Sequence, residues 1–170
     1  KVHKVSSKQI ATMFQAVEID GETYWDGGYS GNPTITPLVR DCVSSDTILI
    51  QINPINRPLT PRTAREIHNR LNEVAFNAPL LKELRMIALL RQVADPGKGE
   101  GAVWAKMRIH RIASEEMAQL SSSSKLLAEW EFFCKLRDKG RRAAEAFLDA
   151  HGADLGVRST LDLDALLEGV

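Results

Sequence analysis

Asp26 is the residue whose neighbours most directly suggest chemistry. It follows the aromatic pair Tyr24-Trp25 and precedes Gly27-Gly28, and the run continues as Tyr29-Ser30-Gly31-Asn32-Pro33. Glycine adopts positive φ without a steric penalty, so Asp-Gly-Gly predicts a sharp turn that holds the carboxylate rigidly at the end of a strand. A carboxylate held in this way suits a general base. The alternative interpretation is an ordinary hairpin that ends in a polar turn.

The stretch from Phe14 to Pro33 (FQAVEIDGETYWDGGYSGNP) resembles the second catalytic block of bacterial patatin-like phospholipases. That family uses a Ser-Asp dyad, and its Asp lies in a D-G-G or D-G-A motif followed by a turn with Asn-Pro. Weaker similarity continues through residues 58–90, 124–126 and 158–163. The resemblance implies that Asp26 takes the proton from a catalytic serine, that Gly27 and Gly28 form the turn that positions it, and that no metal or cofactor takes part.

The nucleophile of that family is missing from this sequence. Patatin-like enzymes carry it in a G-x-S-x-G elbow upstream of the D-G-G block, and the nearest match here is Gly28-Tyr29-Ser30-Gly31, where the second glycine comes one position early. No buried apolar strand precedes Ser30, as a nucleophile elbow requires. We therefore expect the chain, which begins at Lys1, to be the C-terminal part of a longer acyl-ester hydrolase and to be inactive alone. The rival hypothesis is a non-catalytic helical interaction or lipid-surface module.

Composition restricts the possible partners. The chain has 170 residues, 44% of them hydrophobic, and its 22 basic side chains balance 22 acidic ones. A general nucleic-acid binder needs a basic surplus to neutralise phosphates, so no nucleic-acid partner is expected. No apolar run approaches the ~20 residues that span a bilayer. The expected partner is a lipid or another acyl ester, with a peripheral membrane contact as a further interpretation.

The cysteines and histidines do not form a recognisable site. Cys42 and Cys134 lie far apart without a C-x-x-C companion, which favours a reducing cytoplasm, with peripheral contact to the inner membrane in the lipid interpretation. The four histidines show no metal-ligand spacing, so no metal is expected. His68 is predicted to face solvent, and His151 to lie at the end of a helix, where a cation is favourable.

The patterning predicts the elements around Asp26. Residues 17–19 and 22–25 flank Asp20-Gly21, a strong hairpin signal, and the second strand leads to Asp26. Residues 47–52 are nearly continuous and β-branched, as in a strand buried on both faces. The expected fold class is α/β: the C-terminal portion of a patatin-like sandwich, with a hairpin and a buried strand, followed by a mainly helical region. We place the boundary between residues 1–53, the end of the catalytic domain, and residues 54–170.

Several helices are predicted after the boundary. Asn32 is expected either to brace the Asp26 turn or to cap a short helix. Thr60 and Pro61 predict the start of a longer helix, and Thr63 and Glu66 predict a capping box one turn later. An apolar stripe follows at Ile67, Leu71 and Val74, and Asn77-Ala78-Pro79 predicts the end of the helix.

A second helix is expected over residues 80–93. Its leucines either pack on the core, which we favour, or rest on a membrane beside Lys82, Arg85 and Arg91. Residues 95–101 read as a loop and residues 107–112 as a short strand. Ser124 could cap a further helix that buries Trp130 and Phe133 and ends at Lys139-Gly140, and a last short helix is expected before Gly152.

Overall fold

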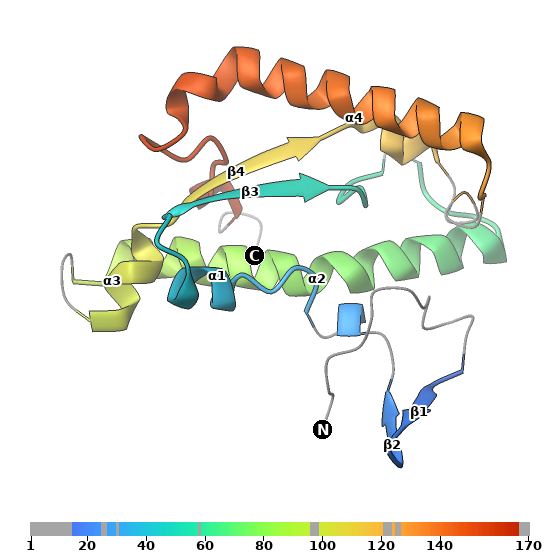
Figure 1. The fold of residues 1–170 in the computed structure, drawn as a ribbon, viewed down its shortest axis with the longest axis horizontal. Helices are drawn as coiled ribbons and strands as arrows, with labels where there is room; N and C mark the ends of the chain where they lie inside the picture. The colour runs from blue at the N-terminus through green and yellow to red at the C-terminus, as the bar shows by residue number, and fades with distance from the viewer. Residues whose placement is uncertain are drawn as a thin grey trace.

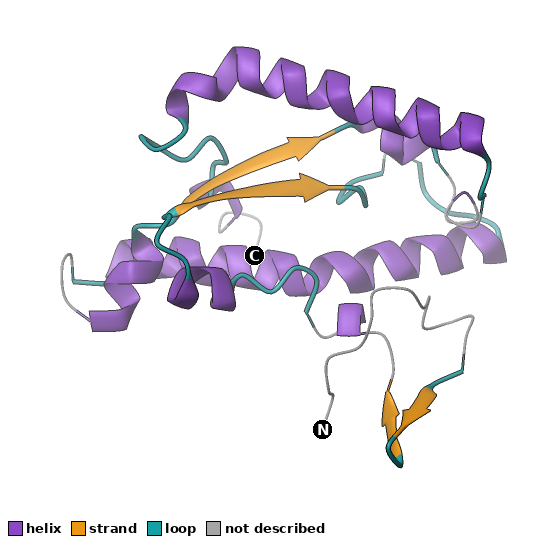
Figure 2. Cartoon of the chain, viewed as in Figure 1, coloured by secondary structure: helices purple, strands orange, loops and turns teal. Residues whose placement is uncertain are grey.

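The computed structural model describes residues 15–24, 27–29, 31–57, 59–95, 99–120, 124 and 127–166. These residues form a mixed α/β structure, as the sequence predicts (Figures 1 and 2). A parallel pair of strands, β3 (Asp46–Gln51) and β4 (Arg108–Ala113), lies between two long helices, α2 (Ala64–Val93) and α4 (Trp130–His151). The short helices α1 (Thr36–Asp41) and α3 (Gly99–Ala105) lie beside α2.

The predicted hairpin before Asp26 is confirmed. Strand β1 (Val17–Ile19) pairs antiparallel with β2 (Glu22–Tyr24), and Val17 lies opposite Tyr24. The connecting residues Asp20 and Gly21 have φ values of 53° and 76°. Two consecutive positive φ values are the geometry of a type I′ turn, which Asp-Gly adopts readily because Gly lacks a Cβ and Asp tolerates the left-handed region.

The strand predicted over residues 47–52 is β3, but only one of its faces is buried. Thr47 and Leu49 are each 7% exposed and point toward α2, whereas Ile48 is 45% and Ile50 75% exposed on the other face. Successive side chains of a strand point to opposite faces, so the alternation is expected once only one face is covered. The strand predicted over residues 107–112 is β4, which pairs with β3 across the domain boundary placed at residue 53.

Helix α2 provides most of one side of the core. Thr63 is its N-cap, and its side chain and that of Glu66 form a capping box, so the helix begins three residues after the predicted start at Pro61. The core contains side chains from α1, the sheet, α2, α3 and the C-terminal segment: Ile35, Val39, Leu49, Leu80, Leu84, Ile87, Ala88, Trp104, Met107, Ile109 and Leu163. Leu80, Leu84 and Ile87 are therefore buried in this core and Leu90 packs against it, which is the packing favoured for residues 80–93.

The break predicted at Asn77-Ala78-Pro79 does not occur, because α2 runs through Pro79 without interruption. A proline inside a helix removes one backbone hydrogen bond and costs about 3 kcal/mol. Packing on both sides offsets that cost. Before the proline, Asn77 is buried and donates its side-chain amide to the carbonyl of Pro54 (3.0 Å), and after it Leu80 and Leu84 enter the core.

Two other predicted boundaries are wrong. The loop expected over residues 95–101 already contains the start of α3 at Gly99. Helix α4 begins at Trp130 rather than near Ser124, and it continues through Gly140 to His151. Trp130 and Phe133 are 77% and 46% exposed, so they do not point inward as expected. Lys139-Gly140 does not end the helix, because the buried residue of α4, Phe147, lies beyond it and holds the later turns against the protein.

Candidate functional site

A turn follows Asp26 in the sequence, and Asp26 itself lies outside the described residues. Gly27–Tyr29 form a 3-10 helical turn, and the backbone N–H of Gly31 donates to the carbonyl of Gly27 at 3.0 Å. A 3-10 turn has negative φ, so the positive φ expected at Gly27 is wrong, and a Cβ there would meet nothing within 4 Å. Both Gly27 and Gly28 are half-buried. The turn contacts α2.

The segment after the turn is fixed by α2 rather than by Asn32. Asn32 is exposed, and α1 begins four residues later with Ile35 as its N-cap, so Asn32 does not cap that helix. No hydrogen bond links the Asn32 side chain to the described part of the chain. Instead, the backbone N–H of Ile35 donates to Oε2 of Glu83 at 2.5 Å, and the Ile35 side chain is fully buried.

A polar network that the sequence analysis did not predict lies at the N-terminal ends of β3 and β4. Nε and Nη2 of Arg108 donate to the carboxylate of Asp46 at 3.0 and 2.6 Å. Nε2 of His110 lies 3.1 Å from Oδ1 of the same carboxylate, and the backbone N–H of Gly156 donates to it at 2.8 Å. The Arg108 hydrogen bonds, helped by those from Gly156 and His110, lower the pKa of Asp46 well below its usual value although burial opposes this.

A His–Asp pair can act as a base only if the imidazole reaches a substrate, and this one does not. His110 is fully buried, and its second ring nitrogen, Nδ1, lies 3.1 Å from the hydroxyl of Thr160. Because an ionised Asp46 only accepts, Nε2 carries a proton directed at Asp46, and Nδ1 shares a hydrogen bond with the Thr160 hydroxyl. The network therefore joins the two strands to the segment that contains Gly156 and Thr160. It depends on the pairing of β3 with β4, which no local sequence signal reveals.

A second buried cluster anchors the loop that follows β3. Glu73 is 9% exposed, and its carboxylate accepts from Nε of Arg57 at 2.9–3.0 Å and from Nη1 of Arg70 at 3.2 Å. Burial opposes ionisation of Glu73, but the hydrogen bonds from Arg57 and Arg70 outweigh it and lower the pKa. Arg57 also donates to the carbonyls of Ala118 and Leu120. The cluster thus joins the β3 loop, α2 and residues 118–120.

This cluster lies beside a cavity of about 790 Å³ at the carboxyl ends of β3 and β4, where parallel sheets commonly bind ligands. Its lining includes Ile52 and Leu59, which are 61% and 81% exposed, and the exposed cation Arg111. Arg111 forms no ion pair within the described part of the chain. Apolar surface beside a free guanidinium is suited to an anionic group attached to an apolar chain.

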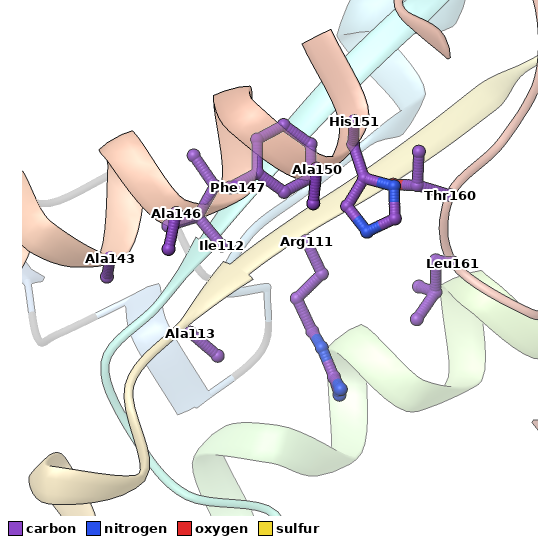
Figure 3. Close-up of a pocket in the computed structure, with 10 residues that line it drawn as sticks. All are labelled: Arg111, Ile112, Ala113, Ala143, Ala146, Phe147, Ala150, His151, Thr160 and Leu161. Carbon is purple, nitrogen blue, oxygen red and sulfur yellow. The ribbon is translucent and has the colours of Figure 1, made fainter.

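A smaller cavity of about 390 Å³ lies between α4 and β4 (Figure 3). Ala143, Ala146 and Ala150 line it, and their small side chains leave space beside Phe147 and His151. Nδ1 of His151 lies 3.2 Å from Oδ2 of Asp154, and the Phe147 ring contacts both His151 and the buried His110. His151 ends α4 as predicted. The lining offers little polar chemistry apart from His151, Arg111 and Thr160.

Within the described ranges, no group of three or more His, Cys, Asp and Glu side chains could hold a metal ion. The same part of the chain contains no helix with both the length and the apolar character needed to cross a bilayer. A scan of protein-family models found no match, and searches of curated proteins and of solved structures found none either.

Proposed function

We propose that this chain is the base-bearing part of a patatin-like serine hydrolase that cleaves acyl esters, with phospholipids as the substrate class. Asp26 takes the proton from a serine that lies outside this sequence. The serine oxygen attacks the ester carbonyl, the alcohol leaves, and water then releases the acyl group from the serine. Backbone N–H groups near the serine stabilise the oxyanion. No metal or cofactor takes part in these steps.

The observation that carries the proposal is the fixed turn directly after Asp26. The 3.0 Å hydrogen bond from Gly31 to Gly27 closes the turn, and the hydrogen bond from Ile35 to Glu83 fixes the segment behind it on α2. In a dyad without histidine, the carboxylate must be held at a fixed distance from the serine hydroxyl, because no third side chain lies between them to transfer the proton. The described hairpin before Asp26 and the described turn after it support this role for Asp26.

The half-covered sheet is consistent with a larger catalytic domain. Parallel sheets occur almost only with both faces covered, and Ile48 and Ile50 leave one face of β3 open. Helix α4 packs over β4, where His110 is fully buried, and does not cover these two isoleucines. Further elements that carry the nucleophile would cover this face and extend the sheet beside β3.

A fluorophosphonate reagent tests the proposal, because it labels only an activated serine. The complete gene product should react, and its intact mass should exceed 18.9 kDa before the label is added. Peptide mapping should place the label on a serine outside the present sequence. An unreactive product, or a label on Ser30, would contradict the proposed mechanism.

A further inference from the structure

The cavity of about 790 Å³ at the carboxyl ends of β3 and β4 has walls that are fixed in place. Its volume lies in the range of about 300–1,000 Å³ that small-molecule sites occupy. The loop after β3 is held by the ion pair between Arg57 and Glu73 and by the hydrogen bond from Asn77 to the carbonyl of Pro54. Arg57 also donates to the carbonyl of Ala118, so the same side chain holds the wall that follows β4. The cavity is therefore preformed.

Arg111 brings an unpaired cation to this cavity. Leu49 lies opposite it in the parallel register and is buried on the side of the sheet that faces α2. Side chains alternate along a strand, so Arg111, Gln51 and Ala113 share that side, and all three line the cavity. Although Arg111 also borders the smaller cavity beside α4, Figure 3 shows its side chain extending away from Phe147 and α4. Its guanidinium is exposed and forms no ion pair with the described residues.

The charges around the cavity favour a ligand with one negative charge. Three cations lie in the lining or donate hydrogen bonds to it: Arg57, Arg70 and Arg111. Two carboxylates oppose them, Glu73, which accepts from the first two cations, and Glu115, which is exposed in the lining. One positive charge is left over, and Arg111 is the cation that carries it. A carboxylate can accept two parallel hydrogen bonds from a guanidinium, whereas Glu115 would repel a more highly charged group.

The apolar part of the lining fits a hydrocarbon chain. Ile52 is 61% exposed and Leu59 is 81% exposed, and both side chains line the cavity. A ligand that covers them removes apolar surface from water, which is favourable. A small anion would leave both side chains in water, and an uncharged hydrocarbon would leave the Arg111 guanidinium without a partner. The ligand that satisfies both parts of the lining has a charged end and an apolar chain.

We propose that this cavity binds a monocarboxylate with an apolar chain, a medium-chain fatty acid in chemical class. The carboxylate accepts from the Arg111 guanidinium, and the chain lies against Ile52 and Leu59. The proposal does not depend on Asp26 or on ester hydrolysis, so the two proposals fail separately. Binding should weaken as salt concentration rises, because salt screens the exposed guanidinium.

Calorimetric titration of the complete gene product with octanoate tests this proposal, with acetate and octylammonium as comparison ligands. Octanoate should bind more tightly than acetate, by up to about fourfold for each additional methylene group, and more tightly than octylammonium. Arg111→Gln should weaken octanoate binding at least about tenfold, because it removes the charged hydrogen-bond donor. Leu59→Gln should reduce the preference for octanoate over acetate, because it removes apolar contact and leaves the cation in place.

Arg91→Gln and Leu148→Gln are the matched controls, because both residues are exposed and neither lines the cavity. Both controls should bind octanoate as the parent does, and circular dichroism should show that all four variants fold. If Arg111→Gln does not fold, the loss of preference in Leu59→Gln decides. Parental octanoate binding by folded Arg111→Gln, or no octanoate binding by the parent, would overturn the proposal. Equal affinity for octanoate and acetate, or for octanoate and octylammonium, would overturn it as well.

Discussion

Asp46→Asn should destabilise the protein because one carboxylate joins β3, β4 and the segment around Gly156. The substitution removes the charge that accepts from Arg108 and His110, at 2.6–3.1 Å, while keeping the shape of the side chain. Hydrogen bonds to charged groups contribute about 1.5–3 kcal/mol each, and water can replace part of that loss because the Asp46 side chain is 20% exposed. We expect a decrease of about 2 kcal/mol in the free energy of unfolding.

Lowering the pH should remove the contribution of the Asp46 carboxylate to the stability of the parent protein. The folded-state pKa of Asp46 is lowered, so its contribution to stability is complete above the unfolded pKa of about 3.9 and is lost as pH falls below that value. Urea unfolding at several pH values between 7 and 3 should show this loss in the parent protein. In Asp46→Asn, the free energy of unfolding should change less with pH. Asp138→Asn is the control, because Asp138 and its hydrogen-bond partner Arg137 are exposed neighbours on the same helix, α4. A variant with the parental midpoint and acid profile would refute this explanation of the network.

Other substitutions test the core, the helix and its cap by chemical unfolding. Leu84→Ala should lower the free energy of unfolding by about 2–5 kcal/mol, because Leu84 is 3% exposed. Leu89→Ala should leave it nearly unchanged, because Leu89 is 51% exposed. Pro79→Ala should stabilise α2 by about 1–3 kcal/mol, because it restores a backbone hydrogen bond, and a destabilised variant would contradict the continuous helix. Thr63→Ala should cost about 1 kcal/mol through loss of the capping box with Glu66, and no loss would show that the cap is unimportant.

Patterns encoded in adjacent residues predicted much of the fold. Asp20-Gly21 gave the hairpin because the turn requires two positive φ values, and Thr63 and Glu66 gave the capping box because its contacts span one helical turn. The break at Pro79 failed as a prediction because its cost is local, whereas the contacts that offset it come from the Pro54 carbonyl and the core.

The polar networks were not predictable from local patterns. Asp46 and His110 are 64 residues apart and meet only through the parallel register of β3 and β4. The sequence predicted the apolar stripe at Ile67, Leu71 and Val74 but not the direction in which it points. Both sides of α2 are apolar, and hydropathy alone does not distinguish which side enters the core.

Ester hydrolysis by Asp26→Asn in the complete gene product tests the proposed base most directly. Removal of a general base should lower kcat by about 10²–10⁴ while the circular dichroism spectrum stays that of the parent. Asp20→Asn is the matched control, because Asp20 has φ 53° and asparagine tolerates that conformation equally well. We predict loss of hydrolysis in Asp26→Asn alone. Parental hydrolysis by a folded Asp26→Asn variant would contradict the assignment of Asp26 as the base.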